Sequence, residues 1–137
     1  MKIEVCNNPD QALINFLDNK IIEFNHARRE INERFPITVT IKNEQGNVIA
    51  GASGKTFGHW LQLAILWVSE DLRGKNYGSK LLTEIEQVAK ARGCQWCLLD
   101  TLNIQAMPFY KKHGYKVEWT QESYPLTGCK YYMTKPL

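Results

Sequence analysis

The chain has 137 residues, of which 44% are hydrophobic and 23% are charged. A chain of this length can bury a core without a disulfide or metal to hold it, so we expect a single domain over residues 1–137. The 17 basic and 14 acidic residues leave a net charge of +3, which disfavours a nucleic-acid binder but allows a small anionic ligand. The N-terminus lacks an apolar run long enough for a signal peptide or membrane span, so we expect a cytoplasmic protein with no membrane partner.

The N-terminal third predicts a short strand followed by a helical region. Residues 2–5 alternate between polar and apolar side chains, as in a strand. Asn8 then suits a helix N-cap and Pro9 the first helical position. The region is either one helix or two helices broken near residues 24–25, and it ends at Pro36. Its apolar stripe consists of Leu13, Leu17, Ile21, Phe24 and Ile31.

Three strands in a meander follow the helical region. Residues 36–42 alternate, residues 43–46 supply turn chemistry, and residues 47–57 return as the second strand of a hairpin. Residues 60–68, WLQLAILWV, are nearly all apolar, which is typical of a central strand covered on both faces.

The second half of the chain alternates helices with strands. Residues 77–92 predict a helix that ends at Gly93, residues 94–102 a strand, and residues 105–114 a short helix. Two strands around a turn at residues 125–128 complete the chain. A strand-helix-strand unit requires a parallel crossover beside an antiparallel hairpin. The fold class is therefore α/β (α+β), with a mixed, mostly antiparallel sheet of about seven strands flanked by helices.

Cys94 and Cys97 form a C-x-x-C pair that could indicate a metal or redox site. On a strand, residues three apart point to opposite faces, so the two thiols would not converge on one ion. No second pair or paired histidines complete a zinc set, so we expect no metal. We interpret all four cysteines as free thiols in a reducing compartment.

The segment LRGKNYGSKLL, residues 72–82, is a candidate anion site. It joins the apolar strand to a helix whose N-terminus favours phosphate. Gly74 and Gly78 permit close approach, Asn76 tolerates positive φ, and Arg73 and Lys75 add cationic donors. The alternative is an ordinary connecting turn. The P-loop and dinucleotide-binding patterns do not match, which disfavours a nucleotide triphosphatase or a dehydrogenase.

Two motifs resemble the GNAT superfamily of acetyl-CoA-dependent N-acetyltransferases. The pattern R/Q-x-x-G-x-G/A is matched by Arg73, Asn76 and Gly78, with Asn76 in place of a glycine. We therefore expect a positive φ at Asn76. The downstream pattern N-x-x-A-x-x-x-Y-x-x-x-G-Y/F is matched by Asn103, Ala106, Tyr110, Gly114 and Tyr115. The order and spacing of both motifs agree with the family over nearly the whole chain.

The resemblance implies a sheet splayed at its central parallel strand pair and acetyl-CoA as the acyl donor, with no metal. In the family, the exposed backbone of the central strand pairs with the pantetheine arm, and the Val68 N–H is a candidate oxyanion donor. The following loop holds the pyrophosphate, and Asn103 contacts the pantetheine. The implied cofactor-binding residues are Leu66, Trp67, Val68, Arg73, Gly74, Lys75, Asn76, Tyr77, Gly78, Ser79, Asn103 and Tyr110.

Tyr110 matches the family tyrosine that acts as general acid toward the CoA sulfur. A phenol with a pKa of about 10 stays protonated at neutral pH, as an acid must; the alternative is an aromatic anchor for a short helix. The central strand carries Gln62 but no carboxylate. The candidate bases are therefore Asp100 and His59, although Asp100 could instead fix a loop and His59 could simply occupy a turn.

The resulting hypothesis is an N-acetyltransferase that transfers the acetyl group directly to a primary amine, on a small molecule or a peptide, in a ternary complex. A homodimer is an open alternative to a monomer. The alternative function is a non-catalytic acyl-CoA-binding or protein-interaction module. Most of the four tryptophans, Trp60, Trp67, Trp96 and Trp119, are interpreted as core residues, and the candidate acceptor-cleft residues are Tyr124, Tyr131 and Tyr132.

Overall fold

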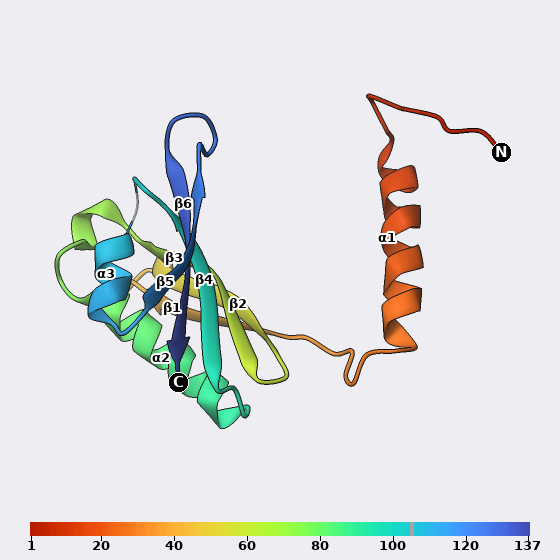
Figure 1. Cartoon of the computed structure of the whole chain (residues 1–137). Helices are drawn as coiled ribbons and strands as arrows, with labels where there is room; N and C mark the ends of the chain where they lie inside the picture. Colours follow the sequence, from red (N-terminus) through yellow and green to blue (C-terminus); the bar gives the residue numbers. More distant parts are fainter. Residues whose placement is uncertain (105) are drawn as a thin grey trace. The chain divides into compact units, whose positions relative to one another are not determined.

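The computed structural model describes residues 1–104 and 106–137. These residues form two compact units, residues 1–33 and residues 34–137, which are coloured in order along the chain in Figure 1. The expectation of one domain over residues 1–137 stays a prediction. In the described part of the chain, no helix has the length and apolarity needed to cross a membrane.

The first unit contains one helix, α1 (Gln11–His26). Asp10 is its N-cap, because a side-chain oxygen of Asp10 accepts a hydrogen bond from the Leu13 N–H at 2.9 Å. The prediction of Asn8 as the cap was therefore wrong by two residues. Residues 1–6 form no strand, since a strand requires a neighbour for its backbone hydrogen bonds.

The second unit is built on a six-stranded mixed sheet, one strand fewer than expected, in the order β1-β2-β3-β4-β6-β5. All neighbouring strands are antiparallel except the central pair, β3 and β4, which is parallel. The strands are β1 (Phe35–Lys42), β2 (Val48–Phe57), β3 (Trp60–Val68), β4 (Trp96–Leu102), β5 (Lys116–Glu122) and β6 (Cys129–Pro136).

The central strands diverge as the resemblance implied. Pairing of β3 with β4 extends only from Trp60 opposite Trp96 to Gln62 opposite Leu98. Beyond that point β3 carries an extra residue, Ala64, because its register with β2 shifts between Ser53 and Gly54. A Cβ at Gly54 would lie 2.5 Å from the Gln62 carbonyl oxygen, so the bulge requires glycine there. The rest of β3 has no ladder partner on its β4 side.

Two helices, α2 (Tyr77–Ala91) and α3 (Met107–Lys112), cover one face of this sheet (Figure 1). A short 3₁₀ turn, η1 (Glu70–Leu72), joins β3 to the loop before α2. Gly93 and Gly114 follow the two helices with φ of 95° and 91°, as expected for left-handed stops. The helices contribute the buried residues Leu81, Leu82, Ile85, Ala89 and Tyr110 to the core.

The opposite face of the sheet carries the tryptophans. Trp60, Trp67, Trp96 and Trp119 are between 38% and 59% exposed, so their interpretation as core residues was wrong. Within residues 34–137, β3 is covered on one face, where its buried residues Leu61 and Leu63 alternate with exposed ones. Strand alternation points the tryptophans away from α2 and α3.

Candidate active site

Two cavities adjoin where β3 and β4 separate. The first, here called the loop cavity, has a volume of about 430 Å³. It is lined by Leu66 and Val68 of β3, by residues 72–79 other than Lys75, and by a set on and before α3: Ala106, Phe109, Lys112 and His113.

The second cavity, here called the strand cleft, lies between the diverging strands and has a volume of about 620 Å³. Residues 64–68 of β3 line one side, and Asp100 and Thr101 of β4 line the other. Arg73, Ile104, Ala106 and Tyr110 complete the lining. The two cavities share Leu66, Val68, Arg73 and Ala106, so a ligand in the loop cavity can extend into the cleft.

The loop before α2 has the conformation predicted from its sequence. Asn76 has φ 66° and ψ 13°, in the left-handed region, and its side chain makes no capping hydrogen bond to the helix. Gly74 has φ 80°. Because the Asn76 side chain does not cap the helix, it leaves the first-turn N–H groups of α2, which begins at this cavity, available to an anion.

Arg73 lies at the junction of the two cavities. Its Nε donates a hydrogen bond to the carbonyl oxygen of Val68 at 3.2 Å, which ties the loop to the end of β3. The guanidinium is thereby held beside both cavities. Lys75, also expected to bind the donor, lies outside the lining of either cavity.

Tyr110 is buried against its aromatic neighbours and also faces the strand cleft. Its side chain is 7% exposed and packs edge-on against Phe109 and Tyr115, with ring centroids 5.3 and 5.6 Å away. It also lines the strand cleft. Burial, followed by the neighbouring Cys97 and Asp100, raises the pKa of Tyr110 to about 12. The hydroxyl is therefore fully protonated at neutral pH.

The structure separates the two candidate bases. Asp100 lines the strand cleft, with its side chain 49% exposed and an oxygen 4.0 Å from the Lys130 Nζ. His59 lies in the turn between β2 and β3, where its carbonyl oxygen accepts hydrogen bonds from the backbone of residues 95 and 96. It lines neither cavity.

Asn103 contacts the hairpin of β5 and β6. Its Oδ1 accepts a hydrogen bond from the Cys129 N–H at 3.2 Å, and its own N–H donates to the Cys129 carbonyl oxygen at 3.0 Å. Gly128 is fitted against this side chain, because a Cβ there would lie 2.6 Å from the Asn103 Oδ1. Asn103 does not line either cavity.

The C-x-x-C pair belongs to the core. Cys94 precedes β4, and both Cys94 and Cys97 are buried, so the expectation of opposite strand faces was wrong. Burial raises the pKa of Cys97 to about 11, which keeps its thiol protonated at neutral pH. Among the described residues, no three His, Cys, Asp or Glu side chains are grouped to hold a metal ion.

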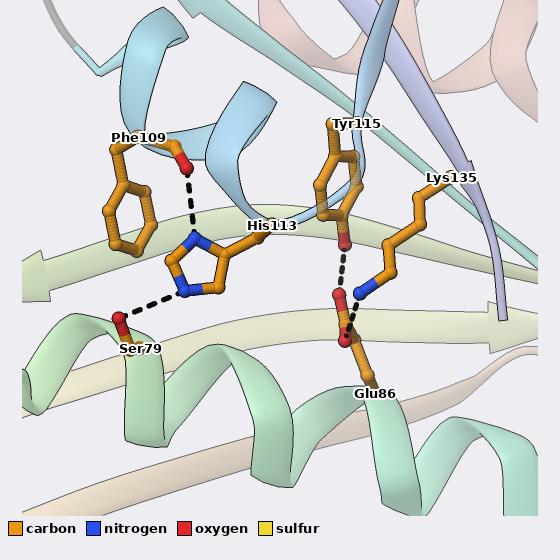
Figure 2. A network of polar contacts seen from close by, with 6 residues as sticks. All are labelled: Ser79, Glu86, Phe109, His113, Tyr115 and Lys135. Atoms are coloured by element: carbon orange, nitrogen blue, oxygen red, sulfur yellow. Dashed lines mark hydrogen bonds and ion pairs between the residues drawn. The ribbon is translucent and has the colours of Figure 1, made fainter.

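Sequence reasoning missed the contribution of α3 to the loop cavity. The His113 ring lies between α3 and α2, with Nδ1 2.9 Å from the Phe109 carbonyl oxygen and Nε2 2.9 Å from the Ser79 Oγ (Figure 2). His113 occupies an unspecified position of the downstream motif, so the motif gave no signal for it. Its partner Ser79 is 34 residues away in the chain.

A second polar network lies further along α2 (Figure 2). The Tyr115 hydroxyl donates to one oxygen of the buried Glu86 carboxylate at 2.7 Å, and the Lys135 ammonium donates to the other at 2.8 Å. The network connects α2 to β6 and to the segment after α3, which holds together the elements that carry the two cavities.

The comparisons with known proteins agree with this geometry. The family model described as "Acetyltransferase (GNAT) family" matches residues 6–115. An acetyltransferase of Agrobacterium fabrum is 33% identical over 95 residues, which cover 69% of each chain. The blasticidin-S acetyltransferase of Streptomyces morookaense is 30% identical over 95 residues, which cover 69% of this chain and 70% of the relative.

The crystal structure of an acetyltransferase from Bacillus cereus superposes with a TM-score of 0.88, is 33% identical and covers 98% of both chains. The likeness therefore includes the divergent central strands, the loop before α2 and the downstream helix. On the family match and these relatives, the chain belongs to the GNAT family of acetyltransferases.

Proposed function

We propose that this protein transfers an acetyl group from acetyl-CoA to a primary amine of a small molecule, by direct attack in a ternary complex. One observation carries the proposal: the anion-favouring loop cavity opens into a cleft that holds both a protonated phenol and a carboxylate. These are the groups that an acyl transfer from a charged donor requires.

The donor has its binding groups along one continuous surface. The first-turn N–H groups of α2, with Arg73 and Lys112, supply positive charge for the pyrophosphate. The unpaired edge of β3 at residues 66–68 supplies backbone partners for the pantetheine arm, with the Val68 N–H as the donor to the thioester oxygen. The acetyl group would then lie in the strand cleft.

Tyr110 serves as the general acid. When the amine nitrogen attacks the thioester carbonyl carbon, the carbon–sulfur bond breaks and its electron pair leaves on sulfur. The Tyr110 hydroxyl gives its proton to that sulfur, and the proton released by the attacking nitrogen restores the phenol. The raised pKa of Tyr110, about 12, ensures that the proton is present at neutral pH.

Asp100 is the better-placed group for taking the proton that the ammonium form of the acceptor loses before attack, and it then passes that proton to solvent. It lines the strand cleft opposite β3, whereas His59 lies outside both cavities. Direct attack is favoured over an acyl-cysteine intermediate because the buried Cys97, with its pKa raised to about 11, has almost no thiolate at neutral pH. The reaction belongs in the cytoplasm, where the thiols stay reduced.

The name of one relative, the blasticidin-S acetyltransferase, supports a small-molecule acceptor. The test is a panel of acceptors incubated with the protein and acetyl-CoA: blasticidin S, other amine-bearing antibiotics, polyamines, amino acids and short peptides. We expect at least one small amine to cause acceptor-dependent release of the CoA thiol. Acetyl-CoA binding without thiol release for any acceptor would instead indicate the non-catalytic module.

A further inference from the structure

His113 is the imidazole in the wall of the loop cavity, and its hydrogen bonds restrict its protonation states. Nδ1 lies 2.9 Å from the Phe109 carbonyl oxygen, which can only accept, so Nδ1 carries a proton in the neutral ring. Nε2 then faces the Ser79 Oγ at 2.9 Å, as Figure 2 shows. The Phe109 ring, 4.5 Å from the imidazole, keeps it in this orientation.

The state of Nε2 decides what Ser79 can offer to a ligand. In neutral His113, Nε2 accepts the single hydroxyl hydrogen of Ser79, which turns that hydrogen away from the cavity. In protonated His113, Nε2 donates to Oγ instead, and the hydroxyl hydrogen is released for another acceptor. Ser79 is the third residue of α2, so its hydroxyl lies beside the first-turn N–H groups.

We propose that His113 is a positioning residue for the donor: it takes up a proton when the pyrophosphate binds and turns the Ser79 hydroxyl toward that anion. The proposal rests on the proposed function, because it assumes that the pyrophosphate occupies the loop cavity. It predicts that donor affinity rises as the pH falls and that binding of the donor takes up a proton.

The other charged groups around His113 strengthen this coupling. Arg73, Lys112 and Tyr77 line the same cavity, and Lys111 precedes Lys112 on α3. A bound anion offsets the repulsion between these positive charges and a proton taken up by His113. Further along α2, Lys135 forms an ion pair with Glu86 at 2.8 Å. The two opposite charges cancel, so this pair adds little net charge near His113.

The probe is dephospho-CoA, since the phosphomonoester of CoA itself titrates near pH 6 and would obscure the effect. Its dissociation constant is measured by titration calorimetry between about pH 5.5 and about pH 7.5, within the range in which histidine side chains generally change charge. Each pH is run in two buffers with different ionisation enthalpies. We expect affinity about tenfold higher at the acidic end, together with net proton uptake on binding.

Three variants distinguish proton uptake by His113, passed on through the Ser79 hydroxyl and here called the His113–Ser79 relay, from a general effect of pH on binding. His113→Gln can still reach Ser79 but does not titrate, and it should bind with no pH dependence. Ser79→Ala keeps the imidazole but removes the hydroxyl, and it should lose most of the dependence. His26→Gln, in α1, is the matched histidine control and should behave as the wild type. Thermal unfolding of each variant at each pH verifies that it is folded.

If the affinity of His113→Gln or of Ser79→Ala for dephospho-CoA depended on pH as strongly as that of the wild type, the His113–Ser79 relay would be overturned. Binding of dephospho-CoA by the wild type with an affinity independent of pH would also overturn it, while leaving the proposed function intact. Absence of binding of both dephospho-CoA and acetyl-CoA at every pH would overturn the proposed function together with the relay.

Discussion

Tyr110 is the residue on which the proposed chemistry of the cleft depends most. A positioned general acid typically contributes 10²- to 10⁴-fold to a rate. We therefore expect Tyr110→Phe to lower kcat by about 10²-fold or more, because the departing thiolate loses its proton donor. The dissociation constant for acetyl-CoA should stay within about twofold, since the phenyl ring preserves the edge-on contacts with Phe109 and Tyr115.

Steady-state kinetics and calorimetry measure these two quantities separately. Tyr115→Phe is the matched control, because Tyr115 is also a buried tyrosine but lies outside the linings of both cavities, and its kcat, measured where the variant is folded, should equal that of the wild type. An unchanged kcat in Tyr110→Phe would leave Tyr110 with its packing role alone.

The raised pKa of Tyr110 also predicts the shape of the pH–rate profile. The pKa of Tyr110 in the folded protein, about 12, lies above the ordinary tyrosine value of about 10, so folding favours the protonated phenol. That contribution to stability is fully present below about pH 10 and is lost as the pH rises through about 12. The rate should therefore show no loss from Tyr110 ionisation below about pH 10. A descending limb near pH 9 that disappears in Tyr110→Phe would contradict this.

Asp100 and His59 can be separated by substitution. We expect Asp100→Asn to lower kcat/KM by about 10²-fold, the contribution typical of a general base, because an amide cannot accept the amine proton. His59→Gln should have little effect, because His59 lies outside both cavities. Initial rates over a range of pH with the best amine of the panel provide the measurement. The reverse order of effects would identify His59 as the base.

At the scale of the elements, the Glu86 network holds α2 and β6 together. Lys135→Met would leave the buried Glu86 carboxylate with the Tyr115 hydroxyl as its remaining partner among the contacts described. Hydrogen bonds to charged groups contribute about 1.5–3 kcal/mol, so we expect a loss of about 2 kcal/mol in the free energy of unfolding. Urea denaturation at neutral pH measures it.

The matched control for that substitution is Lys116→Met. Lys116 pairs with Glu118 at 3.2 Å, but their side chains are 73% and 43% exposed, and such surface pairs contribute about 0–1 kcal/mol. The double variant Glu86→Gln with Lys135→Met should recover part of the loss, because a neutral amide is less costly to bury than a lone carboxylate. If Lys135→Met and Lys116→Met lost equal amounts of unfolding free energy, the Lys135–Glu86 pair would contribute no more than an exposed surface pair.

The elements themselves were largely predictable from local patterns. Alternation and turn residues predicted the six strands of the sheet, and the glycine stops after α2 and α3 were placed correctly. The expected positive φ at Asn76 was also confirmed. The errors occurred where the structure depends on contacts beyond the local sequence pattern. A four-residue alternation at residues 2–5 had no strand to pair with, and Asp10 rather than Asn8 reached the first-turn amides of α1.

At the scale of the whole molecule, the family motifs predicted more of the site than residue chemistry did. They indicated the loop before α2 and Tyr110. In the structure, that loop lines the loop cavity and Tyr110 lines the adjoining strand cleft. The contact between His113 and Ser79 joins residues 34 apart, and the bond from Lys135 to Glu86 joins residues 49 apart. Such pairs depend on how the elements pack, and no local spacing encodes them. For the same reason the apolar character of β3 did not reveal which tryptophans lie on the exposed sheet face.

The central claim is that this protein moves an acetyl group from acetyl-CoA to an amine within the strand cleft. The most direct measurement follows an isotope-labelled acetyl group from acetyl-CoA in the presence of the best amine of the panel, with the product and the intact protein both analysed by mass spectrometry. We predict that the label appears as an amide on the amine, in proportion to the thiol released, with none attached to the protein. Label that stays on CoA, appears only as acetate, or accumulates on the protein would contradict the account.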